Sequence, residues 1–333
     1  MVAGPGPLVP DMTDNHRDAP RRVTLGASDL AVFPLSLGGN VFGWTADEAQ
    51  SFAVLDAYAA AGGNFLDTAD SYSAWVPGNS GGESETIIGD WLRARGNRDE
   101  IVVATKIGAH PEAKGLKADN IKATAEQSLR RLGVERIDLL YTHFDDLSTP
   151  VEEIIATLDA LVKEGKIREI AASNITAERL RASLDFSDRE GLAKYVAVQP
   201  HYNLVSRDTY EGELAAVAAE HRLSAVPYYA LASGFLTGKY RPGGPAVESA
   251  RAQGAGRYLA DPRGPRVLAA LDTVAAAHGA ELASVALAWL TARPTVAAPI
   301  ASARTVEQLP PLLAGAALEL TADQLALLDT ASA

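Results

Sequence analysis

Four residues of the types used in acid–base chemistry stand close to the ends of apolar runs. Asp67, Lys106 and His143 each end or follow such a run, and Tyr72 lies in the segment after Asp67. Adjacent strands of a sheet lie about 4.8 Å apart, so side chains at the ends of neighbouring parallel strands can converge. An ionisable group at such a place is costly to bury without a partner. We therefore expect these four side chains to partner one another at one rim.

Together, the four side chains would make a proton donor. A tyrosine hydroxyl has an ordinary pKa near 10 and is a poor acid at neutral pH. A lysine ammonium beside Tyr72 favours the phenolate and lowers that pKa, while Asp67 opposes the loss of the proton that burial would cause in Lys106. A neutral imidazole at His143 can donate a hydrogen bond to a substrate oxygen. The set predicts a site that protonates a developing alkoxide.

Each of these residues also has a structural explanation when it is taken alone. A strand-end aspartate often caps a helix or turn, a tyrosine often packs half-buried, and a loop lysine is usually solvated. Their positions after three successive apolar runs favour a shared site. A metal site at His143 is not expected, because no second histidine lies at ligand spacing. The other five histidines are scattered along the chain, and we assign them no role.

The elements that must position these residues alternate from about Arg22 onward. The apolar runs are Leu35–Gly39, Asn64–Asp67, Ile101–Thr105, Ile137–Tyr141, Ile167–Ala172, Tyr195–Gln199, Ser224–Tyr228 and Val296–Ile300. The stretches with helical periodicity are Asp47–Ala61, Glu83–Arg95, Asp119–Leu132, Pro150–Glu164, Thr176–Leu184, Tyr210–His221 and the longer Arg263–Arg293. Strands that alternate with helices predict βαβ units and a parallel sheet. Eight strand candidates favour a closed (β/α)8 barrel over an open sheet.

Three further segments complete the predicted architecture. Residues 1–20 are rich in Gly, Pro and Asp, which predicts a disordered leader without the apolar core of a secretory signal. Residues 22–33 read as a β-hairpin, and Gly234–Gly264 as a long loop after the seventh strand. We expect residues 21–333 to form a single (β/α)8 domain. In such a barrel the functional residues lie at the C-terminal ends of the strands.

Composition narrows the class of partner. Lys and Arg number 30 against 42 Asp and Glu, a net charge of −12, which argues against a nucleic-acid partner. The chain has no cysteine, so disulfides, zinc thiolates, iron–sulfur clusters and cysteine nucleophiles are excluded. No window approaches the ~20 apolar residues of a membrane span. We expect a cytoplasmic protein with a small-molecule partner and no membrane partner. The sequence does not specify the oligomeric state.

Several segments, in order along the chain, resemble the motifs of the aldo-keto reductases. They are Leu37–Trp44, Asp67–Tyr72, Gly82–Gly89, Ala104–Lys106, Ala172–Asn174 and Leu231–Tyr240. The resemblance runs from about Arg22 to the C-terminus. It implies a TIM barrel that reduces aldehydes or ketones to alcohols with NADPH, with NADH less favoured. It also implies that Asp67, Tyr72, Lys106 and His143 are the catalytic tetrad, with Tyr72 the general acid.

The same resemblance implies a set of cofactor-binding residues. Ser173, Asn174 and Gln199 match the groups that hold the nicotinamide carboxamide, and Tyr228 matches the aromatic residue that stacks on the ring. The residues that match the pyrophosphate-binding loop are Leu231, Ser233, Gly234, Leu236, Thr237 and Lys239, and those that match the adenosine-side contacts are Arg304 and Gln308. The residue types agree, because carboxamides at adjacent strand ends supply donors and acceptors together.

Some residues on the cofactor side depart from the family, and the residues on the substrate side vary within it. We expect Arg304 to begin the last barrel helix, where the helix N-terminus and the guanidinium both suit a 2′-phosphate, so Arg304 favours NADPH over NADH. Tyr229 stands where relatives often have Ser, and Leu312 where many have an Asn that reads the adenine. Pocket walls in this family come from variable loops. Trp44, Trp75, the 70–82 loop and Phe144 are candidates, and the tryptophans either suit an apolar or aromatic substrate or pack beneath a loop.

Two other functions are consistent with parts of this pattern. One is a non-catalytic regulatory subunit that retains an NADP site, as some relatives do when they are bound to ion channels, and an intact tetrad does not separate it from an enzyme. The other is a Schiff-base aldolase that uses Lys106. A Schiff base gives no reason for the polar and aromatic platform of Asn174, Gln199 and Tyr228, which favours the reductase.

Overall fold

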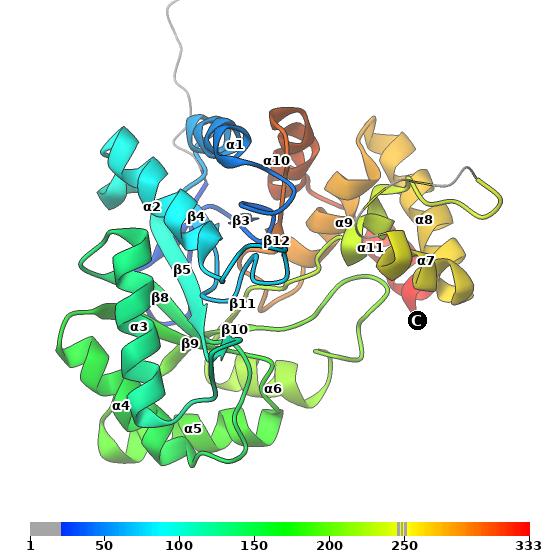
Figure 1. Ribbon diagram of the computed structural model, residues 1–333. Coiled ribbons are helices and arrows are strands. Elements are labelled where there is room, and N and C mark those ends of the chain that lie inside the picture. The colour runs from blue at the N-terminus through cyan, green and yellow to red at the C-terminus, as the bar shows by residue number, and fades with distance from the viewer. Residues whose placement is uncertain (1–20, 245–246, 248, 250–251) are drawn as a thin grey trace, which may run out of the picture.

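The computed structural model describes residues 21–333 except 245–246, 248 and 250–251, and the predicted leader, residues 1–20, lies outside this part. Eight parallel strands form one curled sheet with helices around it (Figure 1). In spatial order the strands are β11 (Ser224–Ala225), β10 (Tyr195–Gln199), β9 (Ile167–Ser173), β8 (Ile137–Thr142), β5 (Val102–Ile107), β4 (Phe65–Asp67), β3 (Ser36–Gly38) and β12 (Ile300–Ala301). Around the barrel each strand lies beside the next one along the chain, as is usual for consecutive βα units.

The sheet closes between β11 and β12, which confirms the (β/α)8 barrel. The Ala225 N–H donates to the carbonyl of Thr295 at 2.7 Å, and the Ile300 N–H donates to the carbonyl of Pro227 at 2.8 Å. Both strands are shorter than the predicted runs Ser224–Tyr228 and Val296–Ile300. The physical reason is that Pro227 and Pro299 have no N–H to donate and so interrupt the ladder.

Eleven α-helices cover the described part of the barrel. They are α1 (Glu48–Ala60), α2 (Glu83–Arg95), α3 (Ala118–Leu132), α4 (Val151–Lys163), α5 (Ala177–Glu190), α6 (Glu213–Glu220), α7 (Ala252–Ala260), α8 (Arg263–His278), α9 (Leu282–Thr291), α10 (Leu309–Ala317) and α11 (Ala322–Ser332). The long stretch of helical periodicity Arg263–Arg293 forms two helices, α8 and α9, because Gly279 caps α8 after His278. That glycine adopts φ +59°, a left-handed cap that stops the helix.

The predicted hairpin is confirmed and covers the N-terminal end of the barrel. Its strands are β1 (Val23–Thr24) and β2 (Ala31–Val32), which pair in antiparallel fashion. Leu25 and Leu30, at its turn, are fully buried against side chains from inside the barrel. Gly26 is required there, because a Cβ at this position would lie 2.2 Å from the carbonyl oxygen of Val196. A second hairpin, β6 (Ala109–His110) with β7 (Ala113–Lys114), was not predicted.

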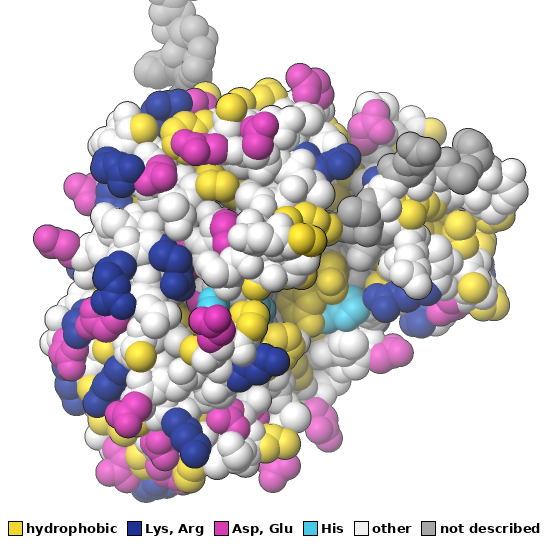
Figure 2. All heavy atoms as spheres, viewed as in Figure 1, with side chains coloured by type: hydrophobic (Ala, Val, Ile, Leu, Met, Phe, Trp, Pro, Cys, Tyr) yellow, Lys and Arg dark blue, Asp and Glu magenta, His cyan; other side chains and the backbone are white. Residues whose placement is uncertain are grey.

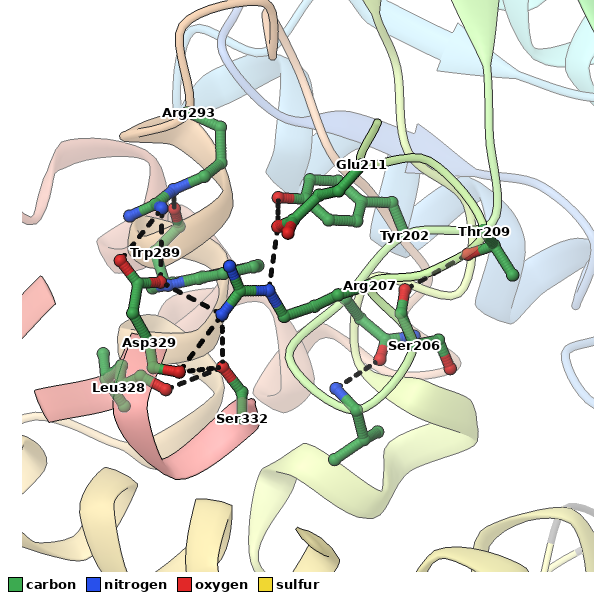
Figure 3. A network of polar contacts seen from close by, with 12 residues as sticks. Tyr202, Ser206, Arg207, Thr209, Glu211, Trp289, Arg293, Leu328, Asp329 and Ser332 are labelled. Carbon is green, nitrogen blue, oxygen red and sulfur yellow. Dashed lines mark hydrogen bonds and ion pairs between the residues drawn. The ribbon is translucent and has the colours of Figure 1, made fainter. Parts of the chain in front are cut away.

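The C-terminal helix is fastened to the barrel by a polar network centred on Arg207 (Figure 3). The Arg207 guanidinium donates to Glu211 at 2.8 Å and to the Ser332 hydroxyl at 2.8 Å. Asp329, also on α11, accepts from the indole N–H of Trp289 at 2.9 Å and from Arg293 at 3.2 Å. These bonds join the loop after β10 to α9 and α11, so they fix the last helix against the wall of the barrel.

Among the described residues, no single helix is long and apolar enough to cross a membrane. Two bent pairs, α8 with α9 and the Val306–Ala317 segment with α11, reach the necessary length and composition only when each pair is taken together.

Candidate active site

Three neighbouring strands bring the four predicted acid–base residues to one rim. Asp67 is the last residue of β4, Lys106 lies near the end of β5, and His143 directly follows β8. The register pairs Asp67 with Ala104 and Lys106 with Tyr141, so the strands end at similar heights. Parallel pairing of short, apolar strands therefore sets these positions, as the sequence predicted.

A buried lysine forms the centre of the cluster. Lys106 is 1% exposed, and its Nζ donates to Asp67 Oδ1 at 2.6 Å, to the Tyr72 hydroxyl oxygen at 2.8 Å and to the carbonyl of Thr68 at 2.8 Å. The Tyr72 hydroxyl lies 3.4 Å from the same oxygen of Asp67. All three donors of the ammonium are used, so its position relative to the phenol is fixed.

The electrostatics of the cluster leave a neutral histidine beside a lysine that is paired with a carboxylate. Burial lowers the pKa of Lys106, and Asp67 acts against that shift through its charge and its hydrogen bond. Burial, with a smaller contribution from the charge of Lys106, lowers the pKa of His143 to about 3. The imidazole is therefore neutral at physiological pH, with one nitrogen able to donate and the other able to accept.

A second group of polar side chains continues from the cluster along the rim. Gln199 Nε2 donates to Asp67 Oδ2 at 2.9 Å, and the Ser173 hydroxyl donates to the carbonyl of Gln199 at 2.9 Å. Asn174 donates to the carbonyl of His143 at 2.9 Å and accepts from the Tyr228 hydroxyl at 2.7 Å. The predicted amide-binding residues thus form one network with the acid–base cluster.

A cavity of about 1080 Å³ lies above this network. Figure 2 shows hydrophobic side chains gathered in the hollow between the main body and the part that carries α7 and α8, with histidine side chains beside them. Nearly all the predicted site residues line the cavity. The exceptions are Lys106, which lies beneath Tyr72, and Leu236, whose side chain is fully buried in the core.

The loop after β11 carries unusual backbone conformations. It includes the 3-10 turn η2 (Ala232–Thr237), in which Ala232, Ser233 and Gly234 all have positive φ, at 48°, 58° and 88°. Consecutive left-handed residues with side chains are strained, and such strain is concentrated at ligand sites. The side chain of Lys239 lies against this turn, because its Nζ is so near Gly234 that a Cβ added there would lie 3.4 Å from it. The loop therefore brings Ser233, Gly234 and the cation of Lys239 to the same cavity.

The predicted adenosine-side residues lie at the start of the last α/β unit. Arg304 and Gln308 both line the cavity, and the backbone N–H of Arg304 donates to Gln308 Oε1 at 2.9 Å. Arg304 does not begin α10 as the sequence suggested, because the 3-10 turn η3 (Val306–Gln308) comes between them. Leu312, on α10, also lines the cavity and is 4% exposed.

Sequence reasoning missed two features next to the site. His201 stacks on Tyr228, with ring centroids 5.5 Å apart and planes 22° apart, although no role was assigned to it. Asp70 and Glu85 are buried, at 1% and 0% exposure, and Arg131 donates to Glu85 at 2.6 Å. The sequence carries no clear signal for these two carboxylates, because polar residues surround both of them, in 68–72 and in 83–86.

Comparisons with known proteins agree with this geometry. Norsolorinic acid reductase stcV from Emericella nidulans is 31% identical over 98% of this chain and 83% of its own length. Protein tas from Escherichia coli is 32% identical over 90% of this chain and 94% of its own. A probable voltage-gated potassium channel subunit beta from Oryza sativa subsp. japonica is 33% identical over 86% and 88%. The sequence profile of the Aldo/keto reductase family matches residues 34–333. The chain therefore belongs to the aldo/keto reductase family of oxidoreductases.

Proposed function

We propose that this protein reduces aldehydes or ketones to alcohols with NADPH, and that Tyr72 is the general acid. The observation that carries the proposal is the contact of Lys106 Nζ with both the Tyr72 hydroxyl, at 2.8 Å, and Asp67, at 2.6 Å. A buried ammonium next to a phenol makes the phenol a better proton donor. The arrangement lies beneath a cavity of about 1080 Å³, large enough for a cofactor and a small substrate.

Each side chain has a distinct task in the proposed reduction. As negative charge develops on the substrate oxygen, the Tyr72 O–H transfers its proton to that oxygen and becomes a phenolate. Lys106 stabilises the phenolate through the hydrogen bond that it already makes, and Asp67 keeps Lys106 charged. His143, neutral because burial lowers its pKa to about 3, orients the carbonyl by a hydrogen bond and does not compete as an acid.

The chemistry of the rim residues suits NADPH. Asn174 is held by Tyr228 and His143, and its Oδ1 retains a second lone pair for the N–H of a carboxamide. Tyr228 offers an aromatic face to a nicotinamide ring, and Lys239, beside the strained turn, offers a cation to phosphates. Arg304 would pair with a 2′-phosphate, which favours NADPH over NADH. The chemistry that bound NADPH supplies is hydride transfer to the carbonyl carbon.

The experiment compares Tyr72→Phe with wild type in the NADPH-dependent reduction of 4-nitrobenzaldehyde. Loss of the general acid is expected to lower kcat by about 10²- to 10⁴-fold, while NADPH binding measured by fluorescence titration stays the same. Tyr210→Phe is the matched control, because it also removes a buried hydroxyl but bonds Thr295 at 2.7 Å, outside the cavity. Equal rates for Tyr72→Phe and wild type would refute the role of Tyr72.

The rice relative, named as a probable channel subunit, supports a second candidate, a regulatory subunit that keeps an NADP site. The same assay separates the two functions. Tight NADPH binding by wild type, without NADPH oxidation above background across a panel of aldehydes and ketones, would favour the regulatory function over the enzyme.

A further inference from the structure

An ion pair between Arg179 and Asp145 joins the loops that carry His143 and Asn174. Arg179, on α5, donates from Nε to Asp145 Oδ2 at 2.9 Å and from Nη2 to Asp145 Oδ1 at 2.9 Å. Two parallel bonds between a guanidinium and a carboxylate fix the relative orientation of the two groups as well as their distance. The side chains are only 20% and 10% exposed, so solvent screens this pair less than a surface pair. We call Arg179 and Asp145 the loop clamp.

Arg179 also holds the backbone of the loop after β8. Its Nη2 donates to the carbonyl of Asp146 at 3.2 Å and to that of Thr149 at 3.1 Å. One side chain therefore contacts this loop at three positions. The loop begins at His143, which directly follows β8 and lines the cavity. A change in the conformation of the loop would therefore move the imidazole of His143.

The other side of the loop clamp is fixed to Asn174. The backbone N–H of Arg179 donates to the hydroxyl of Thr176, the N-cap of α5, at 3.2 Å. Thr176 is two residues after Asn174, so Arg179 has little freedom to move relative to Asn174. Two direct bonds complete the connection. Asn174 Nδ2 donates to the carbonyl of His143 at 2.9 Å, and the Asp145 N–H donates to the carbonyl of Asn174 at 3.4 Å.

The loop clamp lies outside the cavity. Neither of its residues belongs to the described residues that line the cavity, whereas His143 and Asn174 both line it. An effect of the loop clamp on the reaction would therefore pass through those two side chains. In the proposed function His143 orients the carbonyl and Asn174 binds the carboxamide, so their separation sets where the carbonyl carbon lies relative to the nicotinamide ring. A misplacement of about 1 Å can lower a rate by about 10²-fold.

We infer that Arg179 and Asp145 are positioning residues that hold His143, on the substrate side, and Asn174, on the cofactor side, at a fixed separation. The inference rests on the proposed function, since it concerns the geometry of the same site. The alternative is that the loop clamp only stabilises the fold. That alternative predicts a lower free energy of unfolding when the clamp is removed, but an unchanged rate in the molecules that remain folded.

The first test removes the guanidinium. Arg179→Met is assayed in a single turnover with saturating NADPH and 4-nitrobenzaldehyde, well below its unfolding temperature, so that neither product release nor unfolding limits the rate. We expect the rate to fall by about 10-fold or more, and the Kd of NADPH to rise by about 3- to 10-fold. Arg179→Lys keeps the charge without the fork, so its rate should lie between those of wild type and Arg179→Met.

Arg181→Met is the matched control. Arg181 lies on the same helix and pairs with Glu220 at 2.7 Å, but its side chain is 43% exposed. Its loss should change the single-turnover rate and the Kd of NADPH by less than about 2-fold. A rate and a Kd in Arg179→Met that equal those of wild type would overturn the inference.

The second test asks whether the two residues act as a unit. Asp145→Asn removes the charge that Arg179 binds, and it should also lower the single-turnover rate. The double variant, Asp145→Asn with Arg179→Met, should be within about 2-fold of the slower single variant, because each single change already breaks the pair. Losses that multiply in the double variant, or a loss in only one of the single variants, would overturn the inference.

The outcomes distinguish this inference from the proposed function. Turnover by wild type, with equal rates in the loop-clamp variants, would overturn the inference and leave the reductase function intact. If wild type oxidises NADPH with no aldehyde or ketone, the proposed function fails, and hydrogen–deuterium exchange of the free protein decides the inference. Faster exchange in peptides that cover 143–149 and 173–176 of Arg179→Met, but not of Arg181→Met, would support it. Exchange in these peptides that equals that of wild type would overturn it.

Discussion

Asp70 is a buried carboxyl group whose ionisation should oppose folding. It is 1% exposed, and neither oxygen has a hydrogen-bond partner of good geometry among the described residues, although the Gly108 N–H is near enough to lower its pKa slightly. Burial, followed by the charge of Glu85, raises the pKa of Asp70 from 3.8 to about 7, against smaller opposing effects of Arg131 and Lys106. We predict that Asp70→Asn stabilises the protein at alkaline pH.

The sign and size follow from proton linkage. The folded state binds the Asp70 proton more tightly than the unfolded state, so the stability that this group contributes is present below pH 3.8 and is lost as the pH rises through about 7. At about 1.4 kcal/mol for each pH unit between the two pKa values, the full loss is about 4 kcal/mol. Roughly 1.5 kcal/mol of this stability has already been lost at pH 5. Between pH 5 and pH 8 the free energy of unfolding of Asp70→Asn, relative to that of wild type, should therefore rise by about 2.5 kcal/mol.

The assay is urea unfolding of wild type and Asp70→Asn at pH 5, 6, 7 and 8, with the free energy of unfolding taken from each curve. Asp146→Asn is the control of opposite sign. The N–H of Leu116 and the hydroxyls of Ser148 and Thr149 donate to Asp146 and lower its pKa. Loss of that carboxylate should therefore destabilise the protein at all four pH values. A difference between Asp70→Asn and wild type that does not change with pH would refute the reasoning.

Two further predictions test the cofactor assignment and the C-terminal network. Arg304→Ala should weaken NADPH binding by about 10-fold or more and NADH binding much less, because NADH has no 2′-phosphate to accept charge-assisted bonds from Arg304. Fluorescence titration with both cofactors measures this difference. Equal weakening of NADPH and NADH binding would contradict the assignment. Arg207→Ala should lower the free energy of unfolding by about 1–3 kcal/mol, because it removes donors to Glu211 and Ser332 from a guanidinium whose side chain is 19% exposed. In the same urea experiment, Arg93→Ala should change stability by less than about 1 kcal/mol, because the Arg93 side chain is 74% exposed.

The positions of the acid–base residues could be predicted because they depend on the strands alone. A parallel ladder fixes the height at which each strand ends, so residues such as Asp67 and Lys106 meet once the strands are neighbours. The ends of β11 and β12 were predicted less well. Apolar residues continue past Ala225, but the hydrogen-bond ladder stops where Pro227 and Pro299 interrupt it, and a hydrophobic pattern does not register the loss of a donor.

The surroundings of the tetrad depend on contacts between loops, which sequence periodicity does not encode. The sequence left two explanations for Trp75, a substrate contact or packing beneath a loop, because both are consistent with a tryptophan in a variable segment. In the structure Trp75 is half exposed and lines the cavity together with Phe144, so it is not covered by a loop. Asp70, in contrast, is a residue for which the sequence indicates no role of its own. Its backbone N–H donates to the carbonyl of Lys106 at 2.9 Å, and its buried carboxyl group lies near enough to Glu85, on α2, for the charge of Glu85 to raise its pKa. The charge of Glu85 near Asp70 thus comes from a helix, α2, that the strand pattern does not position, and the pH dependence of stability is the measurement that reveals its effect.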